Sequence, residues 1–442
     1  MSVSRRVLLV SDFFYPNPGG VENHIDQLAQ CLVSRGHKAV ILTHAYEGHA
    51  GWRYLSNDLK VYYAPRLPFY SQVTFPTIFG SFRLLRAILI GERIDLVHAH
   101  QSFSVLAHES ILHARTMGYK VVFTDHSLFG FADGSSILTN KLLKFTLADV
   151  HQVICVSHTS KENTVLRACV PPGRVSVIPN AVDTAKFWPS GQPDPPDKLT
   201  IVALSRMVYR KGIDLLNIVI PEMLARHPNL HFVIGGDGAK LPLLKATIQR
   251  QQLAARVEFL GAVPHQAARE VLVRGQIFVN ASLTEAFCMA IVEAAAAGLL
   301  VVSTSVGGVP EVLPAHMIEL AEPTPSSIIE ALEAAIQKLP QRDPWKQHAE
   351  VQAMYSWPQI AQRTERVYDA AAASARDDTF VGRLKRYHKC GRWFGKICCC
   401  VAAVDYMYWC WLDWLYPANG IAIAPDTPYA TDNLQETSLH HA

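Results

Sequence analysis

Two separate charged motifs in the second half of the chain could together hold an elongated anionic ligand. The first is the run Leu204-Ser205-Arg206-Met207-Val208-Tyr209-Arg210-Lys211-Gly212, which follows an expected strand and opens an expected helix. Free N–H groups and the macrodipole at a helix N-terminus add to the charges of side chains such as Arg206 and Lys211, and together they bind a diphosphate. Taken alone, the two cations would more often be ordinary surface charges.

The second motif runs from Thr284 to Glu293 and places Glu285 and Glu293 at the start of an expected helix. On one continuous helix, the two carboxylates would lie about 12 Å apart along the axis. That is wider than the roughly 5 to 9.5 Å between the two carboxylates of a glycoside hydrolase. The spacing therefore disfavours a hydrolase and favours separate contacts to different parts of one ligand. Two solvated helix carboxylates remain the alternative if nothing else surrounds them.

Glycine-rich turns accompany these motifs in both halves of the chain. The sequences are Asn17-Pro18-Gly19-Gly20-Val21-Glu22, Ile234-Gly235-Gly236-Asp237-Gly238 and Val306-Gly307-Gly308-Val309-Pro310-Glu311. Glycines let a nucleotide approach the backbone, so Gly19, Gly20 and Gly236 are candidate donor contacts. The turn at Gly236 is not the G-x-G-x-x-G of a dinucleotide site, and a plain turn explains it equally well. Two such loops across a cleft suit a nucleotide diphosphate bound between domains.

His126 is the candidate reactive group of the first half. It follows an expected strand at the carboxyl edge, where α/β proteins bind ligands, and could orient a sugar or a reacting oxygen. A histidine at such a place is more often structural. His98 and His100 point to one face of a strand, but no third ligand is evident, so we expect no metal. The sequence has no Asp-x-Asp, and cations with helix dipoles must then meet the leaving-group charge.

Short apolar runs that suit buried parallel strands alternate with helical patterns and predict a doubly wound α/β architecture. A proline-rich stretch after Asp183 has the composition of a linker, and the pattern then begins again. We therefore expect two Rossmann-like domains facing across a cleft, with 1–184 and 199–355 as the domains, 185–198 as the linker and 356–380 as a C-terminal helix. The expected strands are Val7–Val10, Lys38–Thr43, Leu96–His98, Lys120–Thr124, Gln152–Val156, Thr200–Leu204, His231–Gly235, Val257–Leu260, Gln276–Val279 and Leu300–Ser303.

One aromatic stretch, Leu67 to Ile90, does not fit the alternation of strands and helices. Its later part places Ile78, Phe82, Leu85 and Leu89 on one helical face, with Arg83 and Arg86 off that face. Such a helix could lie on a membrane surface. A helix packed on the protein core, with solvated arginines, explains the pattern equally well.

Composition excludes several classes of protein. The chain has 442 residues, 49% of them hydrophobic, which is enough for two or three domains with cores of their own. Lys and Arg number 41 against 38 Asp and Glu, so the net charge of +3 gives no basic excess of the kind that nucleic-acid binding needs. Nine cysteines, five of them near the C-terminus, are too few and too uneven for a disulfide scaffold, and they indicate a reducing compartment.

The C-terminal part contains a candidate membrane anchor at 393–416, followed by a tail at 417–442. The run is apolar except at Gly395, Lys396, Asp405 and Asp413, and its cations all lie before it or at its start. By the positive-inside rule, the large N-terminal part is expected to be cytosolic and the tail to lie across the membrane. Asp405 near the middle opposes a true span. A tryptophan-rich anchor lying in the interface is the alternative.

Taken together, these motifs resemble the retaining GT-B glycosyltransferases of family four, whose signature is Arg-x4-Lys-Gly followed by Glu-x7-Glu. The resemblance covers roughly residues 5 to 370. The runs Phe123 to Asp133 and Val156 to Arg167 resemble one branch of that family more closely. The resemblance implies transfer of N-acetylglucosamine from UDP-GlcNAc to phosphatidylinositol, the first step of GPI-anchor biosynthesis. It also implies a multi-subunit complex in the endoplasmic reticulum membrane, with cytosolic catalytic domains, a single C-terminal span, a luminal tail and no metal cofactor.

The resemblance also implies a role for each candidate residue. Arg206 and Lys211 would bind the diphosphate, Glu293 the ribose hydroxyls, and Glu285 the donor sugar. The glycines Gly19 and Gly20 would close on the phosphates, Gly236 would contact the donor, and His126 would sit beside the transferred sugar. Domain 1–184 would then bind the acceptor, and domain 199–355 would bind the nucleotide sugar.

Three alternatives remain open at this stage. Another lipid-acceptor transferase, such as a phosphatidylinositol mannosyltransferase, would need the same cations and glutamates. A non-catalytic scaffold is disfavoured by the intact Arg206, Lys211, Glu285 and Glu293. A nicotinamide oxidoreductase is disfavoured because G-x-G-x-x-G is missing.

Overall fold

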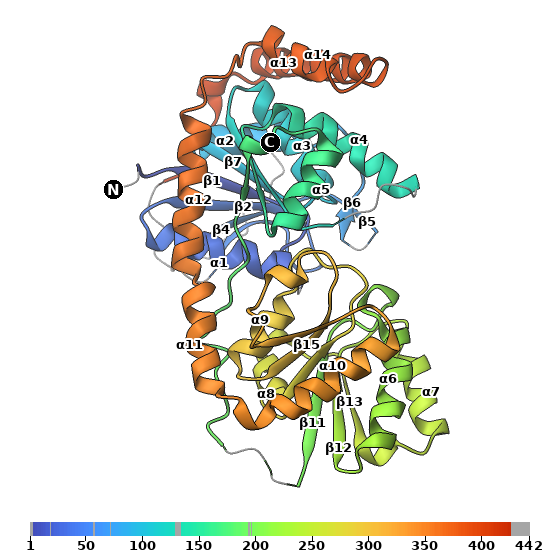
Figure 1. Ribbon diagram of the computed structural model, residues 1–442. Coiled ribbons are helices and arrows are strands. Elements are labelled where there is room, and N and C mark those ends of the chain that lie inside the picture. Colours follow the sequence, from blue (N-terminus) through green and yellow to red (C-terminus); the bar gives the residue numbers. More distant parts are fainter. Residues whose placement is uncertain are drawn as a thin grey trace. The chain divides into compact units, whose positions relative to one another are not determined.

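The computed structural model describes residues 3–17, 19–55, 58–70, 72–128, 134–192, 195 and 197–425 (Figure 1). The chain divides into two compact units. Unit 1 comprises Met1–Val156, Ser160–Ile178 and Pro358–Ala442, and unit 2 comprises Ser157–Thr159 and Pro179–Trp357. The C-terminal segment therefore belongs to the unit that contains the N-terminus.

Unit 1 is built on a sheet that has eight strands among the described residues, in the order β10-β9-β8-β7-β1-β2-β4-β3. Neighbouring strands are parallel except β3 and β4. The strands are β1 (Arg6–Val10), β2 (Lys38–His44), β3 (Gly51–Tyr54), β4 (Lys60–Ala64), β7 (Leu96–His100), β8 (Lys120–Asp125), β9 (Gln152–Cys155) and β10 (Val175–Val177). The helices of this part are α1 (Gly20–Ser34), α2 (Phe82–Gly91), α3 (Val105–Thr116), α4 (Gly134–Asp149) and α5 (His158–Ala168), and β5 (Pro68–Tyr70) and β6 (Val73–Thr74) form a small antiparallel pair.

Unit 2 contains a parallel sheet of six strands within the described ranges, in the order β13-β12-β11-β14-β15-β16. The strands are β11 (Leu199–Leu204), β12 (Leu230–Gly235), β13 (Val257–Gly261), β14 (Ile277–Asn280), β15 (Leu300–Thr304) and β16 (Ile318–Ala321). The helices are α6 (Ile213–Arg226), α7 (Leu241–Arg250), α8 (Ala268–Leu272), α9 (Met289–Ala296), α10 (Pro325–Lys338) and α11 (Pro344–Met354). Aliphatic side chains on both faces of this sheet are buried, as a parallel sheet between two helical layers requires.

Strand order determines where each unit can hold a ligand. In unit 1 the order reverses between β1 and β7, and in unit 2 between β11 and β14. Loops at the carboxyl ends of such strands diverge and leave a crevice for a ligand. The candidate residues Gly19, His126, Lys211 and Glu285 all follow strands at these edges.

The ten strands expected from apolar runs are all present, with ends shifted by two residues at most. Strand β4 was not predicted, although it is buried inside the unit 1 sheet, because a lysine and two tyrosines interrupt its apolar run. The segment 185–198, expected as a linker, lies in unit 2, where Arg269 donates to the backbone carbonyls of Trp188 and Pro189. Its Pro193 and Pro196 lie outside the described residues.

The aromatic stretch from Leu67 to Ile90 contains a helix packed on the core rather than on a surface. Helix α2 buries Phe82, Leu85 and Leu89 in unit 1. Arg86, expected to be solvated, is itself buried and pairs with Asp413. The core alternative is therefore the correct one for α2.

The C-terminal part folds as α12 (Trp357–Ala372), α13 (Phe380–His388) and α14 (Phe394–Leu415), and α13 and α14 lie side by side in Figure 1. The expected span at 393–416 corresponds to α14. No helix within the described ranges is both long enough and apolar enough to cross a membrane. Asp405, which interrupts the apolar run, is fully buried against His113 and Thr116 of α3. Residues 426–442 of the expected tail at 417–442 lie outside the described part of the chain.

Two of the cations thought to flank a membrane span serve a structural purpose instead. Arg383 and Arg386 of α13 bind the buried carboxylate of Asp149 at the end of α4, with nitrogen–oxygen distances of 2.7 and 2.6 Å. Arg376 binds the same carboxylate at 2.9 Å. This cluster fastens α13 to unit 1, so the arginine pattern is not a topology signal there.

Candidate active site

Lys211 lies in a loop whose path depends on one glycine. Gly212 has a left-handed φ of 67°, and a Cβ atom there would lie 1.8 Å from the carbonyl oxygen of Ala281. A side chain at this position would therefore clash with backbone. The close approach brings the loop after β11 against the loop after β14, and Leu283 N donates to Arg210 O at 2.8 Å across the same contact.

The same contact joins Lys211 to Glu285. The Lys211 ammonium forms an ion pair with Glu285 Oε1, and the Ser282 hydroxyl lies 2.8 Å from the same oxygen. Burial lowers the pKa of Lys211, but the neighbouring Glu285 carboxylate outweighs burial and raises that pKa overall. Lys211 is thus a permanent, partly buried cation at the carboxyl edge of the sheet.

Glu285 and Glu293 do not share one helix. Glu285 lies in the loop before α9, whereas Glu293 is inside that helix, so the 12 Å separation estimated for a continuous helix does not apply. Cys288, the residue just before α9, has a left-handed φ of 71°, which is costly for a residue with a Cβ atom. Glu293 is buried and its Oε1 lies 2.9 Å from His265 Nε2. That hydrogen bond raises the pKa of His265.

Arg206 and Gly236 lie beside this centre in unit 2. The Arg206 side chain is exposed, and its charge opposes the effect of Glu285 by lowering the pKa of Lys211, so the two cations are close enough to interact. Gly236 has a φ of 127°, and a Cβ atom there would lie 1.8 Å from the Ser205 carbonyl oxygen. Packing between the loops after β11 and β12 therefore requires a glycine at this position, whether or not a nucleotide binds there.

The glycine loop of unit 1 opens α1. Gly19 is the residue before that helix and is extended, and a Cβ atom there would meet the Glu22 carboxylate at 2.2 Å. Glu22 also accepts a hydrogen bond from the Asn17 amide at 2.5 Å. Nothing lies within 4 Å of a Cβ atom built at Gly20, so the space beside that residue is open.

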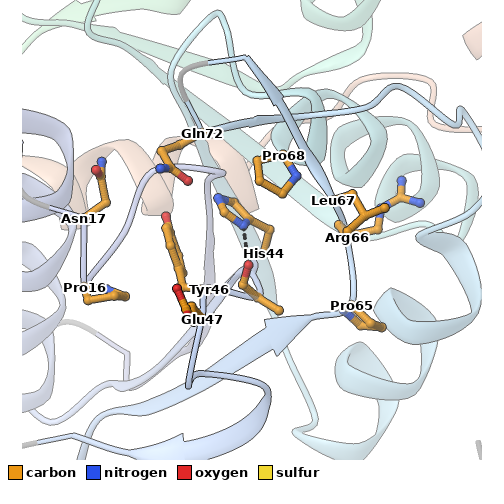
Figure 2. Close-up of a pocket in the computed structure, with 11 residues that line it drawn as sticks. Pro16, Asn17, His44, Tyr46, Glu47, Pro65, Arg66, Leu67, Pro68 and Gln72 are labelled. Atoms are coloured by element: carbon orange, nitrogen blue, oxygen red, sulfur yellow. Dashed lines mark hydrogen bonds between the residues drawn. The ribbon is translucent and has the colours of Figure 1, made fainter.

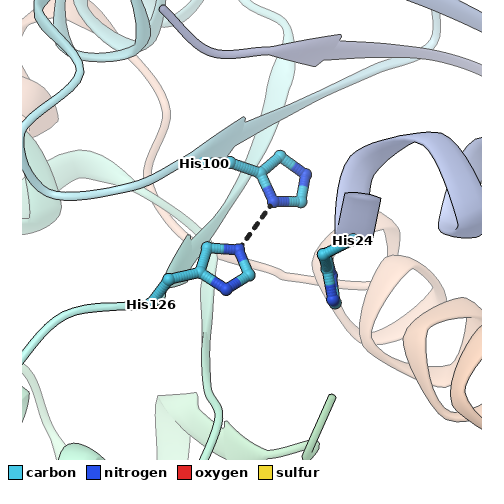
Figure 3. Close-up of side chains that lie close together, drawn as sticks. All are labelled: His24, His100 and His126. Carbon is cyan, nitrogen blue, oxygen red and sulfur yellow. Dashed lines mark hydrogen bonds between the residues drawn. The ribbon is translucent and has the colours of Figure 1, made fainter. Parts of the chain in front are cut away.

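His126 belongs to a cluster of imidazoles at the carboxyl edge of unit 1 (Figure 3). His126 Nε2 lies 3.3 Å from His100 Nδ1, and the ring centroid of His24 in α1 lies 4.7 Å from that of His126. Ligand atoms of the three residues all lie within 4.8 Å of one another. His98 is satisfied separately, by Tyr368 at 2.8 Å and Thr124 at 2.7 Å.

Burial keeps the imidazoles of His100 and His126 neutral. It lowers the pKa of His100 and of His126 well below the ordinary value, and the neighbouring histidines lower both further. Neutral imidazole can accept a hydrogen bond or bind a transition metal through its free nitrogen. The structure thus groups His100 with His24 and His126, and not with His98, which was paired with it in the sequence analysis.

Asp125 fixes the position of the loop that carries His126. Its buried carboxylate accepts hydrogen bonds from Ser127 N at 3.0 Å, from the Ser102 hydroxyl at 2.7 Å and from the Thr164 hydroxyl at 2.9 Å. Three donors on separate segments restrain the turn, so the position of His126 at the sheet edge is set by a buried side chain beside it.

A pocket of about 770 Å³ opens in unit 1 near the same edge (Figure 2). It lies between the loop after β1 and the loops around β2 and β4, and Asn17 places it next to the glycine loop. The lining is mixed, with the polar side chains of His44, Tyr46, Glu47, Arg66 and Gln72 beside the apolar Ala45, Pro65, Leu67 and Pro68. A pocket of this size can accept a cyclic polyol or a sugar.

Several residues of these sites were missed from the sequence. Ser282 touches Glu285, His265 touches Glu293, and His24 approaches His126. His265 and His24 lie on different elements from their partners, whereas Ser282 lies in the same loop as Glu285. Spacing along the chain does not reveal contacts between different elements. The position of Ser282 just after a strand could, however, have indicated a site residue.

Comparison with known families gives two matches along the chain. Residues 44–133 match the family described as PIGA (GPI anchor biosynthesis), and residues 185–352 match the family described as Glycosyl transferases group 1. The two matched segments lie mainly in unit 1 and unit 2, respectively.

Two curated relatives align with almost the whole chain. A phosphatidylinositol N-acetylglucosaminyltransferase subunit of Arabidopsis thaliana is 56% identical over 95% of this chain and 94% of its own length. The protein of the same name from Homo sapiens is 52% identical over 96% of this chain and 88% of its own length.

Solved structures show the fold. Sucrose-phosphate synthase from Thermosynechococcus elongatus superposes with a TM-score of 0.70 at 21% identity, covering 84% of this chain and all of that one. Anabaena HepE in complex with UDP and glucose gives a TM-score of 0.63 at 18% identity, covering 83% of this chain and 99% of that one. With the two parallel sheets, these likenesses establish the GT-B fold.

Proposed function

The chain belongs to the PIGA family of phosphatidylinositol N-acetylglucosaminyltransferase subunits, and on that basis we propose that it transfers N-acetylglucosamine from UDP-GlcNAc to phosphatidylinositol with retention of configuration. The product would begin GPI-anchor biosynthesis. The chain is a glycosyltransferase, and the observation that carries the proposed chemistry is the Lys211–Glu285 ion pair beside Arg206 at the carboxyl edge of unit 2. A diphosphate and the sugar attached to it need a cation and a carboxylate side by side.

The cations would neutralise the leaving group. Lys211 has three N–H donors, so it can hold Glu285 and still donate to the donor diphosphate. Arg206 adds an exposed guanidinium, whose planar fork suits two phosphate oxygens. In this proposal Gly19 and Gly20 of unit 1 close on the phosphates, and Gly236 contacts the nucleotide.

The carboxylates would recognise the two sugars of the donor. Glu285, held by Lys211 and Ser282, is oriented to accept from hydroxyls of N-acetylglucosamine. Glu293, held by His265, would accept from the ribose hydroxyls. A carboxylate fixed before substrate arrives loses little entropy on binding, so positioning contributes directly to the rate.

Retention would follow from attack on the face that the diphosphate leaves. The acceptor inositol hydroxyl would donate a hydrogen bond to the departing phosphate oxygen, and the proton would pass to that oxygen as the glycosidic bond forms. Neutral His126 would lie beside the transferred sugar and hydrogen-bond to it. Fixed cations and dipoles would then supply most of the rate enhancement.

The donor half of the proposal is tested by calorimetry on the full chain. UDP-GlcNAc should bind, GDP-mannose should not compete with it, and NAD should not bind. Competition by GDP-mannose would favour the mannosyltransferase alternative, which the names of the relatives do not favour. Failure of every nucleotide to bind, in a folded protein, would favour a scaffold.

We propose that the inositol head group of the acceptor binds in the pocket of unit 1. The polar lining can bind hydroxyls, and Arg66 supplies a cation, although Glu109 already pairs with it. Ala45→Trp would fill the pocket and should raise KM for phosphatidylinositol roughly tenfold or more, with KM for UDP-GlcNAc unchanged. Ala45→Ser is the matched control. Equal acceptor KM values in the two variants would place the acceptor elsewhere.

We also propose that transfer needs no metal ion, because Lys211 and Arg206 supply the positive charge. Exhaustive treatment with a chelator should leave the initial rate within a factor of about two. If transfer did require a metal ion, the cluster of His24, His100 and His126 would be the site to test. A rate lost on chelation and restored by zinc, but not in His24→Ala, would show that the cluster holds a required metal.

The remaining assignments concern the cellular setting. The word subunit in the names of the relatives supports work within a multi-subunit complex. A lipid acceptor supports a location at a membrane, and we propose the cytosolic face of the endoplasmic reticulum because the family resemblance implies it. Fractionation of cells that express a tagged chain, followed by purification of the tagged complex, tests both assignments.

A further inference from the structure

The two histidines of β7, His98 and His100, differ in how their ring nitrogens are satisfied. Both nitrogens of His98 have partners, which are the hydroxyls of Tyr368 and Thr124. His100 is fully buried, yet its Nε2 has no hydrogen-bond partner among the described residues. A buried polar atom without a partner is uncommon, and a bound ion or water often accounts for it. His98 is thus a structural histidine, whereas hydrogen bonding within unit 1 does not explain His100.

The imidazoles of His24, His100 and His126 come from three separate elements and meet at the carboxyl edge of the unit 1 sheet (Figure 3). One ligand atom of each residue lies within 4.8 Å of the other two. Nitrogen ligands of a tetrahedral zinc ion, with bonds of about 2.0 to 2.1 Å, lie about 3.3 to 3.4 Å apart. His100 Nδ1 and His126 Nε2 are already 3.3 Å apart. Movement of side chains alone would therefore bring the three rings around one ion.

Two of the three rings are oriented before any metal binds. His100 ends β7, and the ring of His98 lies against its ring with the centroids 4.1 Å apart. His126 follows β8 in the turn that the buried Asp125 carboxylate restrains. Ligands that are held in position by their surroundings make a more precise metal site. His126 is the least buried of the three, which gives an ion access from solvent.

The ligand set determines the class of metal. Within the described residues, the cluster consists of imidazoles alone. The Asp125 carboxylate beside it already accepts hydrogen bonds from Ser102, Ser127 and Thr164. Mg²⁺ and Ca²⁺ prefer oxygen ligands, whereas imidazole suits zinc and related transition metals. Three histidines with a fourth position left open are a known ligand set for zinc.

We propose that His24, His100 and His126 form a zinc site and that zinc bound there inhibits glycosyl transfer. This inference rests on the proposed function, in which His126 hydrogen-bonds to the transferred sugar. Zinc bound to His126 fixes that ring and, with its own water ligand, occupies space beside the sugar. The site thus regulates a reaction that itself needs no metal.

Equilibrium dialysis of the full chain against buffered free zinc tests the site directly. His24→Ala should lower zinc affinity by at least roughly 100-fold, since loss of an outer partner of a ligand alone costs up to that much. His316→Ala removes an exposed histidine of unit 2 and should bind zinc as wild type does. Excess Mg²⁺ should not displace the zinc. Equal zinc affinity in wild type and His24→Ala, or displacement by Mg²⁺, would overturn the site.

Cobalt reports the geometry of the ligands and provides a second variant. Co²⁺ in a four-coordinate site absorbs visible light far more strongly than octahedral hydrated Co²⁺, so wild type should give the strong spectrum and zinc should abolish it. His24→Gln keeps a polar side chain of similar size, and once thermal unfolding shows it to be folded, it should give only the weak spectrum. A strong spectrum in this variant, or a weak one in wild type, would overturn the ligand set.

Transfer assays keep the zinc site separable from the proposed function. Saturating zinc should lower the initial rate of wild type at least roughly tenfold, and a chelator should restore it. The rate of His24→Ala should not depend on zinc. Equal inhibition of both proteins, or activation of wild type, would overturn the inhibitory role. Zinc binding without any GlcNAc transfer by zinc-free wild type would contradict the proposed function alone, and transfer without zinc binding would overturn this inference alone.

Discussion

Replacing Lys211 by alanine is expected to lower kcat for GlcNAc transfer by roughly 10² to 10³-fold while the protein stays folded. The ammonium is partly buried and held at the carboxyl edge of unit 2, where the leaving diphosphate develops charge in our proposal. A charge in such a site needs no reorganisation as the bond breaks. Its loss therefore affects the transition state more than the ground state.

The measurement is kcat and KM for UDP-GlcNAc in parallel with the thermal unfolding midpoint. Lys245→Ala is the matched control, because Lys245 is an exposed lysine of α7 in the same unit. Removing Lys211 alone also leaves Glu285 without its ion pair. The double variant Lys211→Ala/Glu285→Gln should recover stability but not turnover. Turnover equal to that of Lys245→Ala would show that the cationic motif is misassigned.

The largest effect on stability is expected at Asp149. Its carboxylate is fully buried and meets Arg383, Arg386 and Arg376 within 3 Å. Asp149→Asn removes the counter-charge of Arg376 and Arg383 and leaves Arg386 only the more distant Asp378, and breaking a buried ion pair typically costs about 3 to 5 kcal/mol. Glu258→Gln is the control, since its ion pair with Arg274 is half exposed and should contribute about 1 kcal/mol or less. Urea unfolding of both variants measures the difference.

The Asp149 cluster also predicts a pH dependence. Burial alone would raise the pKa of Asp149, but the charges of Arg115, Arg383 and Arg386 outweigh burial and hold that pKa well below its ordinary value. In the unfolded chain the group titrates near pH 4. The stabilisation is therefore fully present above about pH 4 and is lost as the pH falls further. The difference in stability between wild type and Asp149→Asn should shrink in that acid range, and a constant difference would contradict the assignment.

The strands and the central site motif could be predicted because their signals are local. A strand buried on both faces needs a continuous apolar run, and Lys211 and Glu285 follow such strands at fixed distances. The contacts made by His24 and Asp405 could not be predicted in this way. His24 meets His126 because the fold brings α1 near the loop after β8, two elements that are far apart in the chain. Asp405 looked like a defect in a membrane span because its partner, His113, lies 292 residues away.

Arginines of the C-terminal segment show the same limitation. A run of cations before an apolar stretch looks the same in the sequence whether the cations face lipid head groups or a buried carboxylate. Arg383 and Arg386 bind Asp149, whereas Lys389, Arg392 and Lys396 are exposed. Only tertiary packing separates the two groups.

The central claim is that this chain transfers N-acetylglucosamine to phosphatidylinositol, and the most direct test is that transfer itself. Membranes from cells that lack the endogenous protein would be supplied with labelled UDP-GlcNAc and phosphatidylinositol after expression of wild type or Lys211→Ala. The account predicts labelled GlcNAc-phosphatidylinositol with wild type and at most a trace with the variant. Wild type that is expressed and binds UDP-GlcNAc, yet gives no labelled lipid in membranes containing the other subunits, would contradict it.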